Sequence, residues 1–219
     1  TAAVGRHTGV GELALTRGQI VAGSYGFRVA QPGGNPTDYG CVTGVVNMTG
    51  GSIRNVNCWL SASAVHGLIV GAGTVANLEA PSYFRGTLNL SGGAVTNSSC
   101  YTGVGLGLSD GDVLQTGGEL RHEVSTYQMV VGAWGGEGRY ILSNGVVVAA
   151  SDVFVGGVTT NLLYHKPYAL YTCCPVTNHC AKGLLRVAGG SFATDGTLWG
   201  SQDGGGGGGG GAKGAGGGG

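Results

Sequence analysis

Charged side chains are scarce in this chain: they make up 10% of its 219 residues, and 11 Lys and Arg balance 11 Asp and Glu. Without an excess of positive charge, no basic surface is available to hold the phosphates of a nucleic acid. No apolar run approaches the 18 or more residues of a membrane-spanning helix. The chain begins at Thr1 without a signal-like segment, which indicates a processed, mature protein. We expect no nucleic-acid partner, no membrane span and no cofactor.

Glycine, by contrast, is abundant, at 49 residues, and much of it belongs to an internal repeat. A first element is a short apolar strand that ends at one or two glycines, and it occurs at 13–18, 46–51, 88–93, 113–118, 141–145 and 185–190. A second element places an apolar residue before Gly or Ala, as at positions 4–5, 29–30, 70–71, 104–105, 131–132, 155–156 and 199–200. Thirteen residues separate Gly5 from Gly18, Gly105 from Gly118, and Gly132 from Gly145.

Within the first element the apolar residues alternate, as a β-strand with one buried face requires. The positions five and three before the last glycine should face inward, and they hold Leu13/Leu15, Val46/Met48, Leu88/Leu90, Val113/Gln115, Tyr140/Leu142 and Leu185/Val187. A mostly Ser or Thr position two before the glycine should lie outside. Each glycine then permits the positive φ of a tight corner.

A unit of this length cannot bury its own apolar face, but stacked units can. The predicted fold is therefore all-β: a single-chain parallel β-helix, or β-solenoid, of about six coils over residues 1–200, with lateral loop insertions. Residues 201–219 form a Gly-rich tail. A β-sandwich is the main alternative, although hairpin-type Asn-Gly and Asp-Gly pairs occur only at 144–145 and 110–111.

The segment 131–147, VGAWGGEGRYILSNGVV, shows both elements most clearly. It resembles the β-solenoid repeats of bacterial autotransporter-type passengers and related Gly-rich surface proteins. The resemblance covers about residues 4–200, with three interruptions. It implies export, an extracellular or cell-surface location, and an adhesive or structural role.

Six cysteines are consistent with an oxidising compartment. Cys58 and Cys100 each lie seven residues after a corner glycine, which predicts a disulfide between neighbouring coils. A second disulfide is expected to close a small loop onto Cys180, with Cys174 as its candidate partner. A zinc site formed with the nearby histidines is the alternative there, and the pairing of Cys41, Cys173, Cys174 and Cys180 stays open.

Other residues suggest contact with glycans. Asn47, Asn89 and Asn97 begin Asn-X-Ser/Thr sequons and are candidate glycosylation sites. The aromatic residues proposed to stack on sugar rings are Trp59, Tyr83 and Trp134.

The favoured function is a structural subunit of an extracellular filament or cell-surface layer, assembled head to tail from copies of the chain, with a possible adhesive role and no enzymatic activity. The first alternative is a non-catalytic glycan-binding module, and the second is a polysaccharide lyase or hydrolase. Cleavage needs paired carboxylates, but the outward position three residues after each corner glycine holds none: Val21, Arg54, Thr96, Arg121, Val148 and Ala193. Glu119 and Glu123 are the nearest candidates, and they lack acidic neighbours on adjacent coils.

Overall fold

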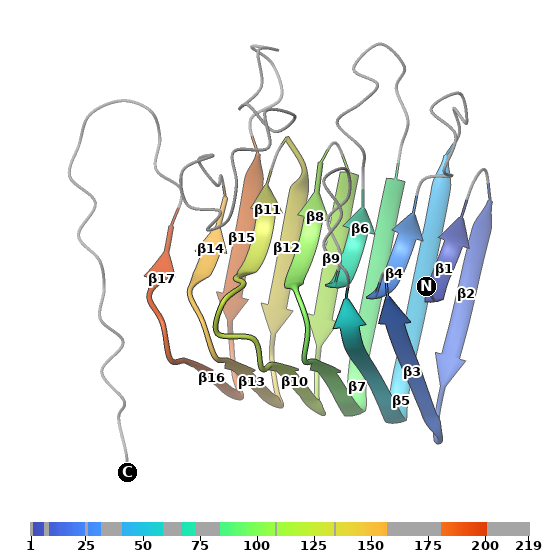
Figure 1. Ribbon diagram of the computed structural model, residues 1–219, viewed down its shortest axis with the longest axis horizontal. Coiled ribbons are helices and arrows are strands. Elements are labelled where there is room, and N and C mark those ends of the chain that lie inside the picture. The colour runs from blue at the N-terminus through green and yellow to red at the C-terminus, as the bar shows by residue number, and fades with distance from the viewer. Residues whose placement is uncertain are drawn as a thin grey trace.

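The computed structural model describes residues 2–6, 9–24, 26–31, 41–58, 67–72, 84–107, 109–133, 135–156 and 181–200. Every regular element within these ranges is a β-strand, and every pairing between strands is parallel. The strands stand side by side along the long axis of the molecule, in chain order from blue to red (Figure 1). The all-β part of the prediction is therefore confirmed.

One sheet contains seven parallel strands, and its spatial order follows the chain. Successive strands of this sheet are separated in the sequence by strands of the other sheet, so the chain passes between the two sheets repeatedly (Figure 1). The strands, in order, are β1 (Ala2–Arg6), β4 (Gly26–Gln31), β6 (Gly67–Ala72), β8 (Tyr101–Leu106), β11 (Met129–Ala133), β14 (Val153–Val155) and β17 (Leu198–Trp199).

The second sheet contains ten strands. Its strands are β2 (Val10–Leu15), β3 (Gln19–Ser24), β5 (Val42–Cys58), β7 (Phe84–Asn97), β9 (Ser109–Gln115), β10 (Glu119–His122), β12 (Glu137–Leu142), β13 (Val146–Ala149), β15 (Lys182–Val187) and β16 (Ser191–Thr194). Strand β5 pairs with both β2 and β3 on one side, and strand β7 pairs with both β9 and β10.

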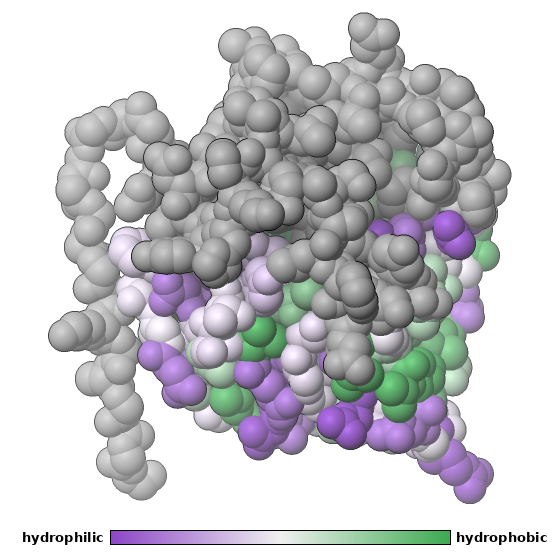
Figure 2. Space-filling model, in the orientation of Figure 1, coloured by the Kyte–Doolittle hydropathy of each residue, from purple (hydrophilic) through white to green (hydrophobic). Residues whose placement is uncertain are grey.

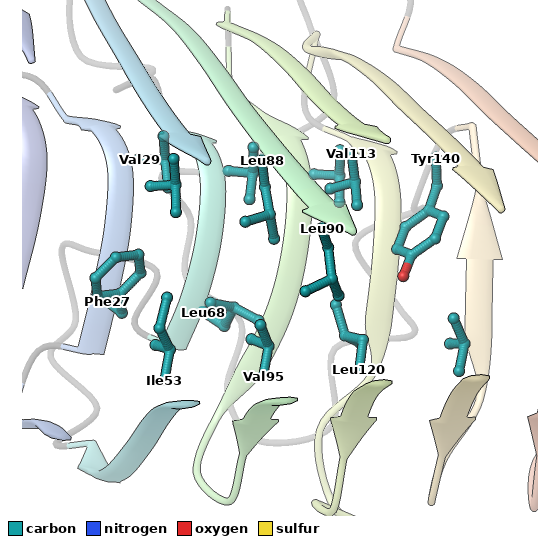
Figure 3. Close-up of a cluster of buried hydrophobic side chains, with 14 of the residues drawn as sticks. Phe27, Val29, Ile53, Leu68, Leu88, Leu90, Val95, Val113, Leu120 and Tyr140 are labelled. Carbon is teal, nitrogen blue, oxygen red and sulfur yellow. The ribbon is translucent and has the colours of Figure 1, made fainter. Parts of the chain in front are cut away.

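The main core lies between the two sheets (Figure 3). Alternate residues of the ten-stranded sheet point into it, and in the inner strands the predicted inward positions are buried, from Val46 and Met48 to Tyr140 and Leu142. Apolar residues two after the corner glycines, such as Ile53 and Leu120, join the same cluster. The predicted inward face is thus confirmed for the inner strands.

The outer faces of the two sheets differ. The inner strands of the seven-stranded sheet are buried on both faces, and a second apolar cluster that includes Ile69, Val130 and Phe154 lies opposite the main core. Strand β9 of the ten-stranded sheet instead alternates between buried and more accessible residues. A parallel sheet that is buried on both faces reads as a continuous apolar run, whereas one solvated face gives alternation.

The corner glycines adopt the conformation that the repeat predicts. Positive φ angles occur at Gly18, Gly51, Gly93, Gly118, Gly145 and Gly190 in the first element, and at Gly5, Gly71, Gly105, Gly132 and Gly156 in the second. Ala30 takes the glycine's place in one repeat and has a φ of 58°. The Ser and Thr residues before the first set of corners are exposed, as expected.

The prediction of a β-solenoid of about six coils is wrong. The described residues form two multi-stranded parallel sheets of seven and ten strands, with strands from two to seventeen residues long. Strands β5 and β7 continue through the glycine pairs that were expected to end them. The physical reason is that pairing resumes at once beyond the glycines: the N–H of Ser52 donates to the carbonyl of Gly18 at 2.9 Å.

The expected insertions lie mostly outside the described residues, as does the Gly-rich segment 201–219. Residues 32–40, 73–83 and 157–180 each connect a strand of the seven-stranded sheet to the next strand of the ten-stranded sheet. The described strand ends that flank these three segments lie at one side of the sheets, because all strands are parallel.

Candidate functional site

The two ends of the strand array are candidate interaction edges. Within the part of the chain that the structure describes, β1, β2 and β3 form one edge, and each pairs with a strand on one side only. At the other end, β15, β16 and β17 form a second edge of the same kind. Strands at an open edge display unpaired backbone N–H and C=O groups that can pair with a further strand.

Core positions are less completely buried on these edge strands. Leu13 and Ile20 at the first edge, and Leu185 and Phe192 at the second, are only partly buried, although they pack against the main core. The same positions on inner strands are covered, as at Tyr140 and Leu120. The difference follows from position, because an edge strand has a neighbour on one side only.

Exposed large apolar side chains also gather at the edges. Of the seven such side chains among the described residues, five lie on edge strands: Val10, Val21, Leu184, Val187 and Leu198. Val10 is 83% exposed and Val187 is 50% exposed. On the face seen in Figure 2, hydrophobic side chains gather toward the end of the molecule formed by the N-terminal strands. Both edges therefore combine accessible apolar surface with backbone that no other described strand pairs on its outer side.

A cluster of charged side chains occupies the outward face of the ten-stranded sheet. Asp112 on β9 lies between two arginines of neighbouring strands: its Oδ2 is 3.3 Å from an Nη of Arg85, and its Oδ1 is 3.5 Å from Nε of Arg139. Lys182 on β15 forms an ion pair with Glu137 on β12. Asp110 is in register with both Arg85 and Glu137. These are surface pairs, so each contributes little to stability.

Within this cluster, Asp110 is partly buried and lies near two other carboxylates. Partial burial raises the pKa of its carboxyl group above the ordinary value, and the carboxylates of Glu137 and Asp112 raise it further. Arg85 and Lys182 oppose this effect. A carboxyl with a raised pKa beside an ionised carboxylate is the arrangement that glycoside hydrolysis uses.

Sequence reasoning missed this cluster because it followed a different column of residues. Four charged residues of the cluster lie eight residues before a corner glycine, whereas the carboxylate prediction rested on the position three residues after it: Arg85, Asp110, Glu137 and Lys182. Glu119, one of the two carboxylates named from the sequence, is paired with Arg121 of its own strand at 2.6 Å. Glu123 accepts a hydrogen bond from Ser98 at 2.7 Å.

A buried polar column runs beside the apolar core. Asn55, Asn97 and His122 occupy register positions on adjacent strands. Asn55 Nδ2 donates to Asn97 Oδ1 at 2.6 Å, and Asn97 Nδ2 donates to Thr102 Oγ1 at 2.9 Å. His122 Nδ1 lies 3.0 Å from that hydroxyl, and its Nε2 lies 2.7 Å from the carbonyl oxygen of Tyr127.

These contacts define the state of His122. A carbonyl only accepts, so Nε2 carries the proton, and Nδ1 of the neutral ring then accepts from the Thr102 hydroxyl. Burial lowers the pKa of His122, in keeping with this neutral form. The column is thus an internal polar network rather than an accessible site.

The three sequons lie in different surroundings. Asn97 is fully buried and its amide is engaged, so a glycan on Asn97 is incompatible with the folded structure. Asn47 and Asn89 are adjacent on the outward face: Asn89 Nδ2 donates to Asn47 Oδ1 at 2.8 Å. Asn47 Nδ2 in turn donates to Glu12 at 2.9 Å. Glycosylation of these two residues stays a prediction.

Several other predicted site residues lie outside the described residues. Trp59, Tyr83 and Trp134 are among them, as are Cys174 and Cys180. Cys58 ends β5, but its side chain is likewise not described, so the disulfide to the buried Cys100 stays a prediction. Cys41 is exposed.

A cavity of about 390 Å³ lies away from the charged cluster and is lined mostly by polar residues, among them Ser125, Gln128, Asp152 and Asp195. The described residues contain no group of three or more His, Cys, Asp and Glu side chains suited to hold a metal ion. They also include no helix of the length and apolar character required to cross a membrane.

Comparison with known proteins identifies no relative: no protein-family model, no curated protein and no solved structure matches this chain. The resemblance to autotransporter-type surface proteins therefore stays a prediction that rests on the repeat alone.

Proposed function

We propose that the chain is a structural subunit that assembles head to tail through its two open edges, in an extracellular filament or a cell-surface layer. The observation that supports this proposal is the pair of edges, where core side chains such as Leu13 and Phe192 are partly exposed beside backbone that no further strand of the described residues pairs. A strand added at either edge would pair with the backbone of that edge and cover its partly exposed core side chains.

The geometry of the edges favours an open assembly. Because all strands are parallel, β1–β3 at one end differ from β15–β17 at the other, and the two edges can meet in a heterologous contact. A heterologous contact that does not close into a ring generates a filament. The six cysteines support an oxidising, extracellular setting for such an assembly.

A charge placed on an edge core position provides the test. Val187 points toward the core side of β15 but is 50% exposed, so a lysine there is tolerated by the single molecule and buried by a stacked copy. Leu114 is 41% exposed on the inner strand β9, and Leu114→Lys is the matched control.

We expect the parent chain and Leu114→Lys to form rods in negative-stain electron micrographs and to sediment faster as concentration rises. Val187→Lys should stay monomeric with an unchanged circular dichroism spectrum. A parent chain that is monomeric at all concentrations, or a Val187→Lys variant that assembles like the control, overturns the proposal.

Polysaccharide cleavage at Asp110 and Glu137 is a second candidate function. It is favoured by the register that places Asp110 beside Glu137 on the neighbouring strand, where partial burial and that carboxylate raise the pKa of Asp110. The same carboxylates are accounted for by a surface ion-pair cluster with Arg85, Arg139 and Lys182, which is why assembly is the leading proposal.

A further inference from the structure

We infer that Asn144 is a site of spontaneous covalent modification, at which the folded chain converts its own asparagine to isoaspartate or aspartate. This modification is independent of the proposed assembly. Asn144 and Gly145 belong to the corner that joins β12 to β13 (Figure 1). The reaction begins when the backbone nitrogen of Gly145 attacks Cγ of Asn144, so it depends on where the corner places these two groups and on what else engages them.

The Gly145 nitrogen lies against the side chain that it would attack. Its N–H donates to Oδ1 of Asn144 at 2.8 Å, which places the nitrogen next to the carboxamide carbon. Among the described residues, no other group accepts this N–H. The pairing of the corner with the next layer uses a different amide, because the N–H of Val146 donates to the carbonyl of Gly118 at 3.0 Å. Strand pairing therefore leaves the attacking nitrogen available.

Asn144 is exposed, and the residue that follows it is glycine. Exposure lets hydroxide ion reach the Gly145 N–H and remove its proton. Glycine has no Cβ that would hinder closure of a ring at its nitrogen. Of the other asparagines whose side chains are described, two precede large residues within strands and two are buried: Asn47 and Asn89, then Asn55 and Asn97. We therefore expect the reaction at Asn144 and not at these four residues.

The reaction needs water and no other co-reactant. The Gly145 nitrogen gives its proton to base and forms a bond to Cγ of Asn144, while the bond from Cγ to Nδ2 breaks and ammonia leaves. The product is a cyclic succinimide. Water then opens one of the two ring carbonyls, which yields either aspartate or isoaspartate. In isoaspartate the main chain runs through Cγ, and the original carbonyl carbon becomes a carboxylate.

The backbone does not require asparagine at this corner. Ala30 and Cys100 are the described residues other than glycine that have a positive φ, so Asn144 lies outside the left-handed region. In the other repeats, the residue before the corner glycine is glycine at four corners and arginine at one: Gly50, Gly92, Gly117, Gly189 and Arg17. Asn144 is thus a reactive residue at a position where the fold accepts an unreactive one.

Isoaspartate at this corner should disturb the layers on both sides, because it adds a methylene group to the main chain. A Cβ added to Gly145 would lie 2.6 Å from the carbonyl oxygen of Gly118, and one added to Gly190 would lie 2.5 Å from the carbonyl oxygen of Gly145. The corner is therefore in close contact with both neighbouring corners. The hydrogen bonds that Val146 donates to Gly118, and Ser191 to Gly145, depend on this spacing.

Ageing of the folded chain tests the site. The parent chain is incubated at neutral and at mildly alkaline pH, and samples are analysed by peptide mapping with mass spectrometry and by enzymatic methyl transfer to isoaspartate. A parallel incubation in urea measures the same reaction in the unfolded chain. Asn144→Gly, which reproduces the residue found at four other corners, is the unreactive control. Asn144→Gln is a second control, because its longer amide side chain cyclises far more slowly.

We expect the folded parent chain to convert at Asn144 and not at Asn47 or Asn89, faster at the higher pH, with isoaspartate among the products. The midpoint of thermal denaturation should fall as the converted fraction rises, and it should stay constant while the two variants age. An Asn144 that stays intact in the folded chain but reacts in urea overturns the inference, because the corner then protects it. Equal conversion at Asn47 or Asn89 overturns the assigned selectivity, and conversion of Asn144 with an unchanged midpoint overturns the expected disturbance of the corner.

Discussion

Tyr140 donates a hydrogen bond from its hydroxyl to Oε1 of Gln115, 2.5 Å away on the neighbouring strand, and both side chains are fully buried in the core. Gln115 Nε2 donates to the carbonyl oxygens of Gly118 and Val146, each at 3.1 Å. The single amide in an otherwise apolar column is thus fully satisfied, as a buried polar group must be.

Removal of the Tyr140 hydroxyl should therefore cost stability. In Tyr140→Phe, Gln115 Oε1 is left buried without its donor, and we expect the free energy of unfolding to fall by about 1–3 kcal/mol. Urea denaturation measures this change. A double-mutant cycle with Gln115→Leu should show a clear coupling energy, and a coupling near zero would contradict the assigned hydrogen bond.

Stability should also fall at alkaline pH because of Tyr140. Burial raises the pKa of its hydroxyl above the ordinary value of 10.0, so the folded state favours the neutral form. The neutral Tyr140 hydroxyl contributes fully to the free energy of unfolding below pH 10. This contribution is lost as pH rises above that value, because the tyrosine ionises in the unfolded chain before it does so in the folded one. Denaturation midpoints measured from pH 8 to 11 should fall less steeply for Tyr140→Phe than for the parent chain.

Acid should destabilise the fold through His122. Burial lowers its pKa below the ordinary value of 6.5, so the unfolded chain binds the proton more tightly and stability falls as pH drops below about 6.5. His122→Asn places a third amide in register with Asn55 and Asn97. This variant should show a shallower loss of stability between pH 7 and 5, and an unchanged slope would exclude His122 as the source.

A glycine column crosses the ten-stranded sheet, and substitution in it should be severe. Its members, in strand register, are Gly11, Gly44, Gly86, Gly111, Gly138 and Gly183. Gly111→Ala forces a methyl group against two backbone atoms at 2.2 Å, and we expect a loss of at least about 1–3 kcal/mol, or failure to fold. In the control Gly23→Ala, the added Cβ meets only the Val56 carbonyl oxygen at 3.6 Å, which is ordinary contact. Its stability should change by about 1 kcal/mol or less. Thermal denaturation of both variants decides the point, and equal effects would contradict the close approach.

The charged cluster should not cleave polysaccharides. We expect no release of reducing or unsaturated ends when the chain is incubated with neutral or anionic polysaccharides, because Asp112 and Glu137 are already paired with basic residues. Release that disappears in both Asp110→Asn and Glu137→Gln would establish the second candidate function instead. Asp195→Asn, which lies at the separate polar cavity, is the control.

The sequence predicts local features well where one residue decides the conformation. Corner glycines such as Gly118 were identified because a positive φ excludes most side chains, and inward residues such as Leu88 were identified from strict alternation. The arrangement of strands was harder to predict. Whether β5 bends at Gly50 and Gly51 or ends there depends on pairing with β2, β3 and β7, which no local pattern records.

The candidate sites were also predictable from the sequence only in part, because they depend on how the strands are arranged. Which strands lie at the open edges depends on the number and order of the strands. In the sequence, Leu13 and Leu185 look like any other apolar residue of the repeat, so their partial exposure cannot be predicted. The cluster around Asp112 was missed because side chains 27 residues apart, such as Arg85 and Asp112, become neighbours only through the strand register.

The repeated register of the glycine column has a consequence for how such a chain can change by duplication or loss. Gly105 and Gly132 hold equivalent positions, so removal of residues 106–132 would join equivalent points of the backbone and leave the strands at both ends untouched. Copying the same segment would lengthen the molecule by one layer in the same way. Gene rearrangement could therefore alter the length of the molecule while preserving both of its edges.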